Sequence, residues 1–210
     1  MNIKSYWSAL LLFEILFLVF FVGFLPSSWN AILIPILYSV LYLTAAFGLE
    51  RYGKIMLRLG FVMLFTQLAV NWLNLTLAFT IFRGLNIIFF AFIVILVISQ
   101  IAKAREVNAR VILDATNGYL LLGLVFALLV DMMIMFDSQA FNFTVNKETN
   151  LQDNLYFSFV TLATLGYGDF VPIKPYAKSL SMLIAVCGQL YVAIIIALLV
   201  GKFSSRAVDN

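Results

Sequence analysis

The 210-residue chain has no histidine, a single cysteine and few charged side chains. The absence of histidine excludes His-based metal sites and nucleophiles that depend on a histidine base. Because Cys187 is the only cysteine, no disulfide can form within the chain. Charged residues make up 11% of the sequence, against about a quarter in ordinary soluble domains. This composition excludes a soluble enzyme and a secreted disulfide scaffold.

The chain is rich in apolar residues, which form 64% of the sequence and give a mean hydropathy of +1.05. A helix needs about 20 mostly apolar residues to cross a bilayer. We therefore predict an all-α integral membrane protein with six transmembrane helices. The net charge of +3 is too small to indicate a nucleic-acid partner. The predicted spans cover residues 7–25, 31–49, 57–79, 84–102, 111–136 and 176–201.

The basic residues predict the orientation of these spans, since Lys and Arg are enriched on the cytoplasmic side. With a cytoplasmic N-terminus, nine of the 13 basic residues fall on the inner side. We expect a multi-pass protein of the cell membrane, plasma or inner, with both termini in the cytoplasm. The nine residues are Lys4, Arg51, Lys54, Arg58, Lys103, Arg105, Arg110, Lys202 and Arg206.

A shorter apolar stretch, residues 155–165, lies between the last two spans and is too short to cross the membrane, so it is interpreted as a re-entrant segment. It leads into the run Thr164-Leu165-Gly166-Tyr167-Gly168-Asp169. The two glycines permit backbone conformations that are strained for other residues. Carbonyl oxygens directed at a shared axis can replace the water shell of a cation. The preceding helix, about 153–163, directs the negative end of its dipole toward that cation.

This run resembles the selectivity filter of potassium channels, and the resemblance covers residues 111–203. It implies that K+ is bound by backbone oxygens of the five filter residues. Leu165 stands where valine is usual, and its side chain is expected to face away from the ion path. Because one loop supplies a quarter of each carbonyl ring, the resemblance implies a homotetramer of this subunit with three identical copies. No cofactor is expected, since K+ is the permeant ion. The filter residues are Thr164, Leu165, Gly166, Tyr167 and Gly168.

The resemblance also implies residues that support the filter. Asp169 is expected to accept a hydrogen bond from Tyr156, while Phe157 packs around the filter and Thr161 supports its inner end. Some family members carry a glutamate where this chain has Val160. Filter gating that depends on a carboxyl pair is therefore in doubt.

The last span is expected to line the inner pore. Gly188 stands where the family often has a bending glycine, although close helix packing explains it equally well. Gln189 is placed just below the filter, where it either faces the cavity or bonds a neighbouring helix. Val192, Ile196 and Leu199 or Val200 share one helical stripe, and we expect an apolar gate there.

Residues 1–106 are predicted to form a four-helix transmembrane domain with the layout of a voltage sensor, and residues 107–210 the pore domain. Voltage sensing needs three or four charges per subunit in the fourth segment. Here that segment has Arg83 at its outer end and no further cation before Lys103. We therefore predict weak or absent voltage gating.

Four polar residues lie inside the N-terminal spans. Gln67, Asn71 and Asn74 share one helical face, and Glu14 lies near the middle of the first span. The preferred interpretation is that Glu14 is protonated, or is hydrogen-bonded to this ladder, and holds the bundle together. The alternative is a site that senses protons or a small ligand.

Three other functions compete with that of a potassium channel. A non-selective cation channel is the nearest alternative. A potassium transporter would carry four pore loops in one chain, whereas this chain has one. An enzyme is not expected, because Glu14 and Asp131 lie on separate helices without a catalytic constellation. We also expect the basic segment 103–110 to form a connecting helix at the inner surface.

Overall fold

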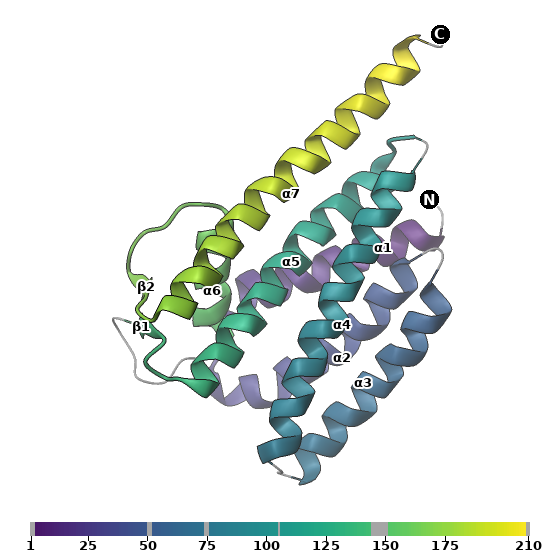
Figure 1. Cartoon of the computed structure of the whole chain (residues 1–210). Helices are drawn as coiled ribbons and strands as arrows, with labels where there is room; N and C mark the ends of the chain where they lie inside the picture. Colours follow the sequence, from purple (N-terminus) through teal and green to yellow (C-terminus); the bar gives the residue numbers. More distant parts are fainter. Residues whose placement is uncertain (1–2, 50–51, 74–75, 105, 144–150, 209–210) are drawn as a thin grey trace. The chain divides into compact units, whose positions relative to one another are not determined.

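The computed structural model describes residues 3–49, 52–73, 76–104, 106–143 and 151–208. Side chains in these ranges are described except at 3, 27–28, 30–32, 71–73, 76–77, 79, 143 and 203–208. The described chain is almost entirely helical (Figure 1). Its elements are α1 (Ile3–Leu16), a π-helical turn (Phe17–Phe21), a 3₁₀ turn (Val22–Phe24), α2 (Ser27–Gly48), α3 (Gly53–Leu73), α4 (Thr76–Lys103), α5 (Ala109–Phe136), β1 (Phe141–Phe143), α6 (Leu151–Leu162), β2 (Phe170–Pro172) and α7 (Pro175–Val208).

Five of the described helices are long and apolar enough to cross a bilayer, as expected for an integral membrane protein. The predicted span 31–49 lies within α2, of which the described side chains form a shorter apolar helix, Leu33–Gly48. The number six therefore stays a prediction. The five candidate spans are Lys4–Phe24, Gly53–Val70, Thr80–Lys103, Ala109–Phe136 and Pro175–Lys202.

Two predictions about the helices are wrong, one about a boundary and one about a connecting helix. α3 ends at Leu73 and α4 begins at Thr76, whereas the sequence placed this break after residue 79. Apolar residues lie on both sides of this boundary, and a glycine such as Gly84 is tolerated inside a membrane helix, so composition alone misplaced the boundary. The expected connecting helix 103–110 is also absent, because the described residues between Lys103 and Ala109 are not helical.

The chain divides into two compact units, Met1–Leu121 and Leu122–Asn210. In the first unit, α2 packs against both α1 and α4. The ring of Trp7 on α1 stacks on Phe47 of α2 with centroids 4.4 Å apart. On α4, Phe89 and Phe90 lie 5.4 and 5.5 Å from the ring of the buried Tyr42. The core of this unit is therefore an aromatic and aliphatic helix bundle.

A buried carboxylate joins three helices at one end of this unit. Asp114 of α5 accepts hydrogen bonds from Ser8 of α1 at 2.6 Å and from Gln100 of α4 at 2.7 Å. The guanidinium of Arg110 lies 3.8 Å from the same carboxylate and also donates to the carbonyl of Gly48 at 3.0 Å. These bonds satisfy charges that would otherwise be costly to bury.

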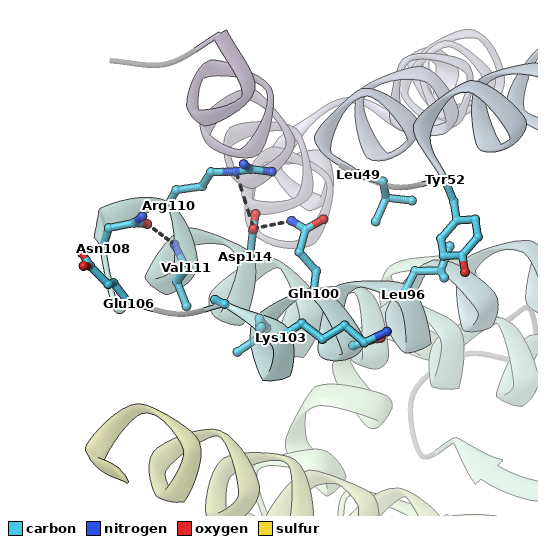
Figure 2. Close-up of a pocket in the computed structure, with 13 residues that line it drawn as sticks. Leu49, Tyr52, Leu96, Gln100, Lys103, Glu106, Asn108, Arg110, Val111 and Asp114 are labelled. Atoms are coloured by element: carbon cyan, nitrogen blue, oxygen red, sulfur yellow. Dashed lines mark hydrogen bonds and ion pairs between the residues drawn. The ribbon is translucent and has the colours of Figure 1, made fainter. Parts of the chain in front are cut away.

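A pocket of about 600 Å³ lies beside this junction (Figure 2). Its walls carry two cations, Lys103 and Arg110, and two carboxylates, Glu106 and Asp114. Because these formal charges balance, the pocket presents no net charge that would select a ligand. The remaining lining residues are Leu49, Tyr52, Leu96, Ser99, Gln100, Ile101, Ala104, Asn108 and Val111.

In the second unit, two short strands connect the segment after α5 to the segment before α7. β1 and β2 pair antiparallel, with Phe141 opposite Pro172. The amide of Ile173 extends the pair by donating to the carbonyl of Ala140 at 2.9 Å. The short helix α6 packs beside α7 (Figure 1). The loop 163–169 therefore connects the end of α6 to the start of β2.

Candidate functional site

The loop 163–169 has an unusual backbone. Left-handed φ angles occur at every second residue, +58° at Thr164, +56° at Gly166 and +80° at Gly168. The two glycines adopt this region without steric cost, whereas Thr164 is a non-glycine residue held there by its surroundings. Left-handed residues at alternate positions turn successive backbone dipoles toward one side of the chain, which an extended strand does not do. A loop with this alternation can present successive carbonyl groups on one side.

The loop begins directly from the last turn of α6. The amide of Thr164 donates to the carbonyl of Thr161 at 3.0 Å, and the amide of Leu165 donates to Val160 at 2.9 Å. These bonds hold the loop against the C-terminal end of the helix, where the dipole is negative. Val160, which has no carboxyl group, contributes through its backbone.

The carbonyl oxygens of residues 164–167 are available to a ligand. Within the part of the chain that the structure describes, no hydrogen bond reaches them. Backbone carbonyls in folded proteins are nearly always paired with a protein group or with water. Four successive free carbonyls beside a negative helix end therefore form a site suited to a cation.

The hydrogen bond predicted between Tyr156 and Asp169 is present, with a length of 2.6 Å. The hydrogen bond to Asp169 is the main cause that raises the pKa of Tyr156 to about 12, followed by desolvation and the nearby charge. The ring of Tyr156 also packs against Phe170 at 5.4 Å. This contact joins α6 to the residue that follows the loop.

The other two predicted support residues, Phe157 and Thr161, lie on α6 as expected. Each of them contacts a different part of the chain. Phe157 is buried and packs edge-on against Phe141 of β1, with centroids 5.1 Å apart. Thr161 is half-buried and accepts the bond from the Thr164 amide through its carbonyl. Their roles in a filter stay predictions.

Gly188 lies at a close contact between α6 and α7. A Cβ atom at this position would overlap the carbonyl oxygen of Leu162. α7 runs without interruption through Gly188, from Pro175 to Val208. The geometry thus accounts for the glycine by close packing, and the hinge role stays a prediction.

The predicted inner-pore residues occupy an exposed stripe of α7. They lie beside the buried face of the same helix, which includes Ile184, Tyr191 and Ile195. Neither their pore-lining role nor the gate is tested by this arrangement. The exposed residues are Gln189, Val192, Ile196 and Val200.

Two members of the predicted polar cluster of the N-terminal half, Glu14 and Gln67, have described side chains, and these two bond to different partners. Glu14 accepts a hydrogen bond from Thr44 of α2 at 2.7 Å, whereas Gln67 donates to the carbonyl of Pro35 at 3.1 Å. The Asn71 side chain and Asn74 lie outside the described residues. Glu14 therefore bonds to α2 and not to Gln67, because α2 packs against both α1 and α3.

Sequence reasoning missed two buried polar residues of α6. Asn154 donates to Asp131 of α5 at 3.1 Å, and Ser158 donates to the carbonyl of Gly123 at 2.7 Å. Both side chains have no exposed surface. Their spacing of four residues on a short apolar helix was the available signal, since it places them on one face.

The part of the chain that contains the loop 163–169 is similar to known proteins. Residues 118–205, which contain α6, the loop and most of α7, match the ion channel family. Over 52 residues the chain is 42% identical to the inward rectifier potassium channel Kirbac3.1 of Paramagnetospirillum magnetotacticum, covering 25% of this chain and 18% of that protein. Through this region, the chain is similar to potassium channels.

Other potassium channels match over similar stretches. The A-type voltage-gated potassium channel KCND3 of Rattus norvegicus is 30% identical over 87 residues, 41% of this chain and 13% of that protein. The potassium voltage-gated channel protein shk-1 of Caenorhabditis elegans is 34% identical over 58 residues, 28% and 11% of the two chains. The chain thus spans less than a fifth of each relative. No solved structure matches it.

These findings confirm the resemblance to potassium channels that the sequence predicted, and the family and relatives that match are channels and not enzymes. Together with the apolar helices, they support a multi-pass membrane protein. The six-segment layout stays a prediction.

Proposed function

We propose that this chain forms a potassium-selective channel, in which K+ passes through a filter made by residues 164–168. The supporting observation is the loop itself, where alternate left-handed residues accompany free carbonyl oxygens at 164–167. Such oxygens replace the hydration shell of K+ without holding it as tightly as a carboxylate would. Four copies complete each carbonyl ring, because one loop supplies a quarter of it.

The exposure of α7 supports the assembly of copies. Only 22% of its candidate span is buried within the chain, against 50% for that of α5, although both are strongly apolar. Leu165 and Tyr167 of the loop are 58% and 67% exposed. In the proposed homotetramer, neighbouring subunits cover these surfaces.

The proposed subunit has the six-span layout with both termini in the cytoplasm, an N-terminal domain of residues 1–106 and a pore domain of residues 107–210. Gln189, Val192, Ile196 and Val200 line the inner pore, where an apolar constriction gates by dewetting. Strong voltage gating is not part of the proposal. α4 carries cations at Arg83 and Lys103 alone, and its described buried residues are aromatic or aliphatic apart from Asn86.

The reversal potential of the reconstituted protein tests the proposal. With K+ on one side of the bilayer and Na+ on the other, a potassium-selective pore reverses far from zero, near the K+ equilibrium potential. A reversal potential near zero with measurable current would identify the non-selective cation channel instead. Discrete unitary currents separate both from the transporter alternative.

A matched pair of glycine variants links the current to the loop. Gly166 and Gly201 both have open space where an added Cβ atom would lie, with nothing within 4 Å, but only Gly166 has a left-handed φ, of +56°. Gly166→Ala adds strain of roughly 1–2 kcal/mol in each subunit. We expect Gly166→Ala to reduce K+ selectivity, while Gly201→Ala conducts as the unmodified protein does.

A further inference from the structure

Two hydrogen bonds, one part-buried and one buried, join α6 to α5 at different positions along the helix axes. Asn154 Nδ2 donates to Asp131 Oδ1 at 3.1 Å, and Ser158 Oγ donates to the carbonyl of Gly123 at 2.7 Å. From the first bond to the second, the donor lies further toward the C-terminus of α6 and the acceptor further toward the N-terminus of α5. This is expected for antiparallel helices. A displacement of α6 by one residue would break both bonds.

Steric contacts also restrict where α6 can lie. A Cβ atom on Gly123 of α5 would overlap the ring of Phe159, and one on Gly188 of α7 would overlap the carbonyl of Leu162. These contacts leave no space for α6 to move toward either helix. They do not prevent sliding along the helix axis, which the two hydrogen bonds oppose.

The bond between Asn154 and Asp131 differs in kind from the other one. Its acceptor is a carboxylate near the first turn of α6, where the helix dipole favours a negative charge. The Asn154 side chain has no exposed surface, and its Oδ1 atom accepts no hydrogen bond within the described residues. The amide is therefore oriented by the carboxylate alone, since the flipped amide would direct its oxygen at Asp131.

We propose that Asp131 and Asn154 are positioning residues for the selectivity filter. The pair sets the position of α6 along its axis and its rotation about that axis. It thereby determines where residues 164–168, which follow the end of the helix, are placed. The loop begins through backbone bonds to Val160 and Thr161, so a shift of α6 is transmitted directly to the filter carbonyls. This inference rests on the proposed channel function and adds a determinant of selectivity outside the filter.

Exchange of the two side chains tests the proposal. Asn154→Asp alone sets two carboxylates against each other, and we expect the K+/Na+ permeability ratio to fall by about tenfold, within the coupling range of contacting residues. The double variant D131N/N154D restores the bond with donor and acceptor reversed, and the ratio returns to within about twofold of the unmodified channel. Asp131→Asn alone keeps an acceptor oxygen but removes the charge that orients the Asn154 amide, so we expect a smaller fall in the ratio than with N154D.

Three controls separate positioning from general disruption. Asp153→Asn changes a charge in the same turn of α6 and leaves the permeability ratio unchanged. Size-exclusion chromatography reports whether each variant assembles. If N154D does not assemble, Asn154→Ala removes the donor without adding charge and is expected to lower the ratio in an assembled protein.

An assembled N154D or N154A channel with the permeability ratio of the unmodified protein would overturn the proposal. A double variant no more selective than N154D would overturn it as well, because the bond would then not be the cause. Failure of the channel function itself is distinguishable, since the unmodified protein would then reverse near zero under the same ion gradient.

Discussion

The phenolic hydroxyl of Tyr156 donates a hydrogen bond of 2.6 Å to Oδ2 of Asp169. This bond joins the helix before the loop 163–169 to the residue that ends the loop, so it fixes the C-terminal end of the loop. The backbone bonds of Leu165 and Thr164 to α6 fix its N-terminal end. Among the described residues, no hydrogen bond reaches the carbonyl groups of 164–167 between these anchors.

Loss of the Tyr156 hydroxyl should shorten the conducting lifetime of the filter. Tyr156→Phe keeps the ring contact with Phe170 and removes only the bond to Asp169. We expect macroscopic K+ current to decline severalfold faster during sustained activation. Asp169→Asn retains an acceptor oxygen and should show a smaller change. Equal rates of decline in all three proteins would contradict a bracing role.

The same bond predicts a pH dependence at high pH. Because the bond to Asp169 raises the pKa of Tyr156 from 10.0 to about 12, the protonated hydroxyl is favoured in the folded protein. Its stabilising contribution is complete below pH 10 and is lost as the pH rises through about 12. We expect the melting temperature of the purified protein to fall over this pH window, and to fall by more than the melting temperature of the Tyr156→Phe variant does. Parallel melting curves would argue against this assignment.

Alanine substitutions at the glycines of α5 and α7 are expected to destabilise the protein to different degrees. Gly188→Ala meets the backbone carbonyl of Leu162, which cannot move without α6, whereas Gly123→Ala meets the end of the Phe159 side chain. Overpacking of this kind costs about 1–3 kcal/mol, and Gly188→Ala should be at the upper end. Gly201→Ala, with open space, is the control. Thermal melting of the assembled protein measures the series.

Single-channel recording of Gly188→Ala distinguishes packing from a hinge. If close packing is the reason for the glycine, stability and selectivity change together. A variant that assembles with full stability and altered open probability would favour the hinge.

Substitution of Glu14 tests whether this buried carboxyl group is structural. Glu14→Gln keeps an acceptor oxygen for the Thr44 hydroxyl, so we expect normal assembly and an unchanged pH profile of the current. Thr44→Val removes the donor and should lower stability by about 1 kcal/mol, a typical value for such bonds between membrane helices. A pH profile shifted by Glu14→Gln would instead support the sensing interpretation.

Voltage dependence should be shallow. With cations in α4 at Arg83 and Lys103 alone, the segment lacks the three or four charges per subunit that steep gating requires. We expect a nearly constant open probability between −100 and +100 mV, roughly the range in which charged sensors respond. Arg83→Gln should leave the curve unchanged. A steep curve that flattens in this variant would contradict the prediction.

The chemistry of the loop could be predicted from the sequence because it depends on short-range properties. Glycine at 166 and 168 permits left-handed φ angles wherever the chain is placed, and the spacing from Tyr156 to Asp169 is compatible with one helix followed by one loop. The boundary between α3 and α4 could not be located in the same way, since both flanks are apolar.

Composition and motif alone indicated that this protein belongs in a membrane and carries a run that resembles the filter of potassium channels, because excess apolar surface and a Gly-Tyr-Gly run have few other physical uses together. Only the tertiary structure decided which side chains meet. It paired Glu14 with Thr44 instead of Gln67, connected Asn154 to Asp131, and placed Gly188 against Leu162. Helical periodicity predicts which face a residue occupies, but the partner on the facing helix depends on how the two helices are offset and rotated.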